Sequence, residues 1–83
     1  MIKGTITYRQ PKNKTLEDLI LSLVQKHGGQ RLGEFGLNEG RFELLVGFKK
    51  ETAAINFKKD ADQQLRFLDS RIEVILFIPK KVF

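Results

Sequence analysis

Residues 49–70, KKETAAINFKKDADQQLRFLDS, allow two interpretations that lead to different folds. In the first, the segment is a single amphipathic helix that Thr52 caps at its N-terminus. The apolar stripe of this helix, at a spacing typical of one buried face, consists of Ala54, Phe57, Ala61, Leu65 and Leu68.

The second interpretation begins with a short strand instead. Residues 53–58 would pair back on Phe48, and a helix would follow with Asp60 as its cap and Gln63 in the capping-box position. We favour the single helix. An additional strand would reverse the direction of every later element. The end of the fold at which Lys80 and Lys81 lie therefore depends on this choice.

The N-terminal part of the chain predicts a strand followed by a helix. Apolar and polar residues alternate over residues 2–9, as in a half-buried strand. Apolar residues then recur at helical spacing over residues 16–27, and Thr15 precedes them as an expected N-terminal cap. Gly28 follows this helix, and it can take the left-handed conformation that ends a helix.

The middle of the chain predicts a hairpin. Its two strands cover residues 30–37 and 41–48, joined by a turn that contains a glycine. A register that keeps the apolar residues on one face pairs Leu37 with Phe42, Phe35 with Leu44, and Gly33 with Val46.

Residues 71–79 complete the fold. They are nearly continuously apolar up to Pro79, which is typical of an interior strand. The order strand, helix, strand, strand, helix, strand predicts an α+β fold. We expect a ferredoxin-like βαββαβ two-layer sandwich, with a four-stranded antiparallel sheet and two helices on one face. With only 83 residues, the chain 1–83 is expected to be a single domain.

The composition narrows the class of protein further. The sequence has no cysteine, which excludes disulfides and thiolate metal sites. It has no apolar run of about 20 residues and no signal peptide at its N-terminus, so we expect a cytoplasmic protein that does not use a membrane. Fifteen lysines and arginines against ten acids give a net charge of +5, which suits a negatively charged partner such as nucleic acid.

The glycines of residues 27–36, HGGQRLGEFG, do not form a phosphate-binding loop. Gly28 and Gly33 have the spacing of such a loop, but Glu34 and Phe35 stand where lysine and a hydroxyl residue are needed. His27 is the only histidine, and no cluster of carboxylates accompanies it. We therefore predict no metal, no cofactor and no enzymatic activity.

One end of the expected fold collects basic residues. This basic pole consists of Lys3, Lys26, His27, Arg31, Lys49, Lys50, Lys80 and Lys81. Glu51 is the only acid expected nearby, and the second helix starts there with its positive dipole end. The pole predicts contacts to nucleic-acid phosphates, although lysines that only solubilise the ends of elements would give the same pattern.

The uncovered sheet face offers a second hypothesis, in which a protein partner or a second copy docks there. Its apolar centre is expected to be Leu45, Ile75 and Phe77, rimmed by charges. RNA-recognition motifs stack bases on aromatic residues of such a face, but here the corresponding positions carry threonine and leucine. The sequence thus leaves two functions open: a nucleic-acid-binding module and a protein-interaction or assembly module.

Overall fold

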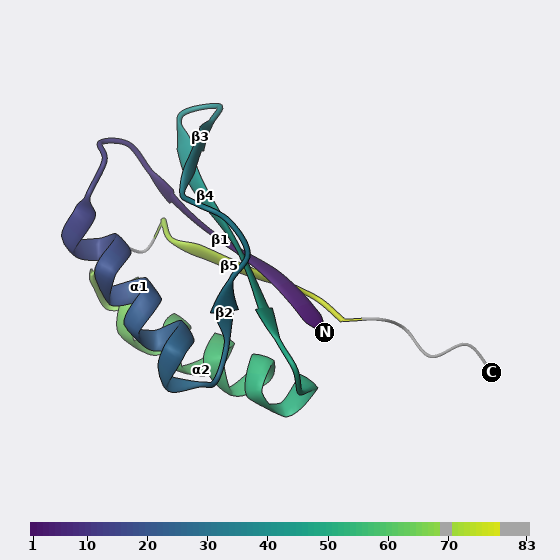
Figure 1. Ribbon diagram of the computed structural model, residues 1–83. Coiled ribbons are helices and arrows are strands. Elements are labelled where there is room, and N and C mark those ends of the chain that lie inside the picture. Colours follow the sequence, from purple (N-terminus) through teal and green to yellow (C-terminus); the bar gives the residue numbers. More distant parts are fainter. Residues whose placement is uncertain (69–70, 79–83) are drawn as a thin grey trace.

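The computed structural model describes residues 1–68 and 71–78, which form a small α+β fold with two helices and an antiparallel sheet of five strands (Figure 1). In chain order the elements are β1 (Ile2–Arg9), α1 (Lys14–Lys26), β2 (Gln30–Arg31), β3 (Gly36–Asn38), β4 (Arg41–Phe48), α2 (Glu51–Leu68) and β5 (Glu73–Phe77).

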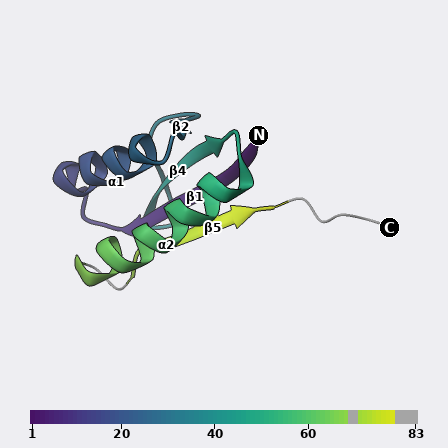
Figure 2. The ribbon, with the colours of Figure 1, turned by 90° about the horizontal axis from the view of Figure 1, so that it is seen from below.

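Strand β1 lies at the centre of the sheet. The strand order is β2-β4-β1-β5, and β3 also pairs with β4. Both helices lie on the same side of this sheet (Figures 1 and 2), which leaves the other face uncovered by helices. Even on that open face Thr5 and Thr7 are buried, because the side chains of β4 and β5 flank them.

Residues 51–68 form one continuous helix, as the first interpretation predicts. Its residues Ala54, Phe57, Ala61 and Leu65 are fully buried, whereas Leu68 at its end is exposed. The prediction of Thr52 as the cap is wrong. The N–H of Ala54 donates to the carbonyl of Lys50 over 3.2 Å, so the helix begins one residue before Thr52.

The start of α1 also differs from the prediction. Asn13, and not Thr15, is the cap: its side-chain oxygen accepts a 3.0 Å hydrogen bond from the N–H of Leu16. Asn13 has the extended backbone that a cap requires, whereas Thr15 is already helical. At the other end Gly28 has a φ of +72°, the left-handed conformation expected of it.

The predicted strand over residues 30–37 is interrupted, and the sheet therefore has five strands where four were expected. Leu37 pairs with Phe42 as predicted, but Arg31 takes the place opposite Val46 that was assigned to Gly33. Between these two paired segments, residues 32–35 lie opposite only residues 44–45. The longer segment, 32–35, therefore bulges out of the ladder.

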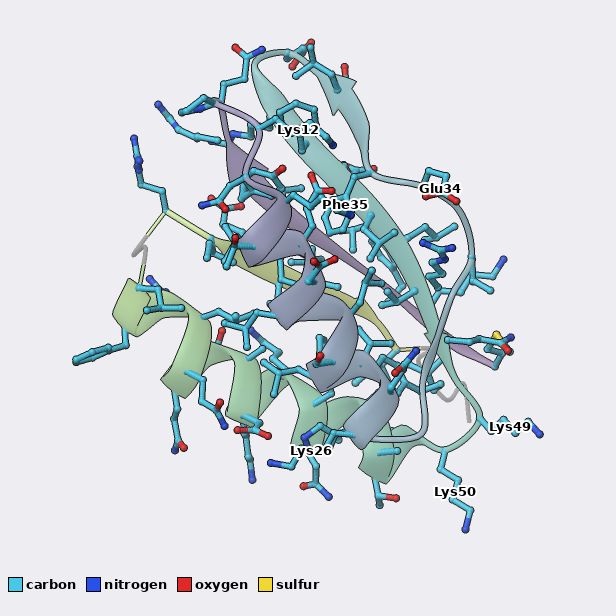
Figure 3. All side chains as sticks on the ribbon, turned by 60° about the vertical axis from the view of Figure 1, so that its left-hand side comes forward. Lys12, Lys26, Glu34, Phe35, Lys49 and Lys50 are labelled. Carbon is cyan, nitrogen blue, oxygen red and sulfur yellow. The ribbon has the colours of Figure 1, made fainter. Side chains whose placement is uncertain are left out.

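Aromatic packing accounts for this bulge. The ring of Phe35 turns inward against Tyr8, at 5.7 Å between ring centroids, while Glu34 points outward (Figure 3). Before the bulge, the N–H of Leu32 still donates to the carbonyl of Leu45 over 2.8 Å. The chain therefore gives up ladder hydrogen bonds over a few residues while the Phe35 ring becomes partly buried against Tyr8.

The core lies between the helices and the sheet, and an aromatic pair joins its elements. Phe48 of β4 and Phe57 of α2 are fully buried, with 5.1 Å between their ring centroids. The ring of Phe48 also fills the space beside Gly29, so that a Cβ atom at Gly29 would overlap with a ring carbon. The segment after α1 can therefore pass close to β4 only because residue 29 has no side chain.

Candidate nucleic-acid interface

The described residues of the predicted basic pole do lie at one end of the fold. Lys3 is near the start of β1, Arg31 is in β2, and Lys26 and His27 end α1. The remaining two, residues 49–50, join β4 to α2. Figure 3 shows Lys26, Lys49 and Lys50 at this end and Lys12 at the opposite one. Lys80 and Lys81 lie outside the described residues.

Asp60 neutralises part of this pole. Its Oδ2 atom lies 3.1 Å from Nζ of Lys26 and 2.8 Å from Nε2 of His27. Gln64 also donates to its other oxygen. The prediction that Glu51 is the only acid near the pole is therefore wrong, because the Asp60 carboxylate reaches from α2 to the end of α1. The bond with His27 and the bond with Lys26 lower the pKa of Asp60 to about 2.

This carboxylate makes stability depend on pH. Because the pKa of Asp60 falls from 3.8 to about 2 on folding, its stabilising contribution is complete above pH 3.8 and is lost as the pH falls toward 2. We expect Asp60→Asn to lower the melting temperature at about pH 6 and to lower it much less at about pH 2. Asp18→Asn is the control, because Asp18 is exposed and forms only a 3.8 Å pair with Lys14. Equal losses at both pH values would contradict this role of Asp60.

Three lysines of the pole carry a charge that no carboxylate of the described residues neutralises. Arg31 lies 3.4 Å from Glu34 in an exposed pair of the kind that contributes little. Lys3, Lys49 and Lys50 form no ion pair with any residue in 1–68 or 71–78. Three unpaired cations therefore lie where β4 passes into α2 and beside the start of β1, whereas Arg9 lies at the far end of β1 and Lys59 and Arg66 lie on α2.

The open sheet face has an apolar half and a charged half. Leu45, Ile75 and Phe77 are 37%, 46% and 55% exposed and belong to one face, as predicted. The structure adds Met1 and Leu32, which lie over Gly47 next to this group. Sequence reasoning missed both, because their positions depend on the chain end and on the bulge rather than on strand alternation.

The charged half of the face forms a shallow hollow. This hollow of about 540 Å³ is lined by threonines, Arg9, Arg41, Glu43 and Glu73. Arg41 and Glu73 lie 3.6 Å apart, so opposite charges face each other inside it. The hollow therefore has no strong preference for one sign of charge.

A buried polar cluster at the opposite end of the molecule was not predicted. The Tyr8 hydroxyl donates to Glu17, and Nζ of Lys12 lies 2.9 Å from the same carboxylate. The N–H of Asn13 donates to the Tyr8 oxygen over 3.2 Å. Burial and the neighbouring carboxylate raise the pKa of Tyr8 to about 12. The cluster joins β1 to the start of α1. Because each of its polar side chains forms a hydrogen bond with another member of the cluster, its role is structural.

Within residues 1–68 and 71–78, no three side chains among histidine, aspartate and glutamate come together in a way that would hold a metal ion. In the same part of the chain, neither helix combines the length and the apolar character needed to cross a membrane.

No protein family model and no curated protein matches this sequence. Among solved structures, the de novo designed protein Foldit4 is similar over 98% of this chain and 96% of its own, with a TM-score of 0.66. The two chains share a fold. Their sequence identity is 17%, so the likeness concerns the α+β arrangement alone and carries no information on function.

Proposed function

We propose that this protein is a small non-enzymatic nucleic-acid-binding module that contacts backbone phosphates through the basic pole. The observation that supports this function is the unneutralised charge of Lys3, Lys49 and Lys50. Of the other cations in the described residues, six lie within 4 Å of a carboxylate, namely Lys12, Lys14, Lys26, Arg31, Arg41 and Lys58. Arg9, Lys59 and Arg66 form no such pair but lie outside the pole, the first at the end of β1 and the other two on α2.

Free ammonium groups favour phosphate for a physical reason. Each lysine that neutralises a phosphate releases a condensed counterion, which favours binding and makes it sensitive to salt. Lys49 and Lys50 also immediately precede the N-terminus of α2, whose dipole adds positive potential at the same place. Lys80 and Lys81 are included in the proposed binding site because of the sequence alone, since they lie outside the described residues.

The test is fluorescence anisotropy with labelled single-stranded and duplex DNA and RNA at about 50 and 200 mM salt, where phosphate contacts lose affinity steeply. We expect Lys49→Ala and Lys50→Ala each to weaken binding and to reduce the salt slope by about 1. Lys14→Ala is the matched control, because Lys14 is equally exposed but lies on α1 and is paired with Asp18. Unchanged affinity in the double variant of Lys49 and Lys50 would reject this site.

We infer a ferredoxin-like two-layer sandwich in which β2 and β3 together take the place of the second strand. The strand order β2-β4-β1-β5 and the position of both helices on one face support this assignment.

A protein-interaction or assembly module is the second candidate. The observation that favours it is the apolar group formed by Leu45, Ile75 and Phe77 together with Met1 and Leu32, all of them at least 37% exposed. A second copy or another protein would bury this group. Sedimentation velocity at low and high salt distinguishes the candidates, since hydrophobic self-association persists in salt whereas phosphate contacts do not.

A further inference from the structure

The outward face of α2 carries one continuous row of exposed side chains. This α2 stripe consists of Thr52, Asn56, Lys59, Gln63 and Arg66, all of them exposed. The spacings of four, three, four and three residues place them on one line along the helix. The buried residues of α2 lie on the opposite side of the same helix, against β4, β5 and α1.

The α2 stripe contains hydrogen-bonding and positively charged side chains and no acid. Two of the acids that lie beside it are neutralised, Asp60 by Lys26 and His27, and Asp62 by Lys58 over 3.1 Å. The third, Glu51, is exposed at the N-terminal end of the helix next to Thr52. A face that serves only to solubilise a helix ordinarily mixes both signs of charge. The stripe itself therefore carries a net positive charge from Lys59 and Arg66, and Lys49 and Lys50 precede it, with Glu51 between them.

The stripe also repeats. An amide is followed three residues later by a cation in Asn56 and Lys59, and again in Gln63 and Arg66, seven residues further on. Two helical turns separate the repeats by about 10.5 Å, since the helix rises 1.5 Å per residue. This distance is about three base-pair steps of duplex DNA at 3.4 Å each. Amides and cations are the side chains that read adenine and guanine edges and contact phosphates.

We propose that the α2 stripe enters the major groove of duplex DNA, an inference that rests on the proposed nucleic-acid function and names its substrate. A helix with its side chains is about 10–12 Å across, which fits a groove about 12 Å wide. The major groove of duplex RNA is too narrow for side chains to read. Lys49 and Lys50, at the N-terminal end of the stripe, then meet the phosphates at the edge of the groove.

Two matched pairs of variants test this inference. Gln63→Glu and Gln10→Glu introduce the same charge at exposed positions, the first on the α2 stripe and the second directly after β1, at the end of the fold opposite the basic pole. Lys59→Ala and Lys14→Ala remove the same charge from α2 and from α1. Binding is measured by anisotropy with labelled duplex DNA of about 20 base pairs, with single-stranded DNA, with duplex RNA and with polyglutamate as competitors.

We expect Gln63→Glu and Lys59→Ala to weaken binding to duplex DNA at least several-fold, with a salt slope about 1 smaller for Lys59→Ala. Gln10→Glu and Lys14→Ala should bind as the wild type does. All four positions are exposed, so thermal melting should show folded proteins of nearly unchanged stability.

The possible failures can be told apart. Normal binding by Gln63→Glu and Lys59→Ala, together with weak binding by Lys49→Ala, would overturn the α2 stripe and leave the proposed function intact. Tighter binding of single-stranded DNA, duplex RNA or polyglutamate than of duplex DNA would also overturn it. A wild type that binds no nucleic acid at about 50 mM salt would reject the proposed function itself.

Discussion

Replacing Phe57 by alanine should lower the free energy of unfolding by about 3–5 kcal/mol, because it leaves a large cavity in a core that cannot fully close. Phe57 is fully buried and contacts elements on both sides of α2. Its ring centroid lies 5.1 Å from that of Phe48 on β4 and 6.2 Å from that of His27 at the end of α1. Urea denaturation followed by circular dichroism measures the loss.

Phe67→Ala is the matched control for this prediction. Phe67 lies on the same helix but is 89% exposed, so its removal should change stability by no more than about 0.5 kcal/mol. If the two variants lost equal stability, the orientation of α2 described above would be wrong. The α2 stripe would then not face the solvent.

Gly29→Ala should destabilise the protein by about 1–3 kcal/mol through overpacking. A Cβ atom at this position would overlap with the Phe48 ring, and that ring is itself held against Phe57. The ring therefore cannot move aside without disturbing α2. Chemical denaturation of the variant and the wild type under the same conditions gives the difference.

We expect the opposite effect on stability when a second glycine of the same stretch, Gly33, is replaced by alanine. Gly33 has nothing within 4 Å of the position that a Cβ atom would take, and its φ is outside the left-handed region. Gly33→Ala should therefore be neutral or should stabilise the protein by about 0.4–1 kcal/mol, because it restricts the unfolded chain. A larger loss from Gly33→Ala than from Gly29→Ala would contradict the packing described for both residues.

The parts of the fold that sequence could predict are those fixed by local pattern. The apolar stripe of α2 has helical periodicity over its whole length, and that signal favours the single helix, which the structure confirms, over a strand followed by a shorter helix. The pairing of Leu37 with Phe42 follows from a short turn and from alternation on both strands. The common position of the basic pole then follows from the order of the elements.

Interactions between distant residues could not be predicted in this way. Asp60 lies 33 positions after His27 in the sequence, and neither residue carries a local signal of their contact. The bulge at 32–35 arises because Phe35 packs on Tyr8, which belongs to a strand much earlier in the chain. Asn13 and Thr15 are both good caps, and the hydrogen bond from Asn13 to the Tyr8 oxygen favours the first.

The bulge at residues 32–35 makes this chain unusually easy to lengthen. Strands β2 and β3 pair with β4 in registers that differ by two residues, so neither register dictates the other. Gly33 and Glu34 are exposed and lie between the hydrogen bond of Leu32 and the packed ring of Phe35. Extra residues inserted between them, such as a peptide tag or a labelling site, would extend a loop without moving either strand.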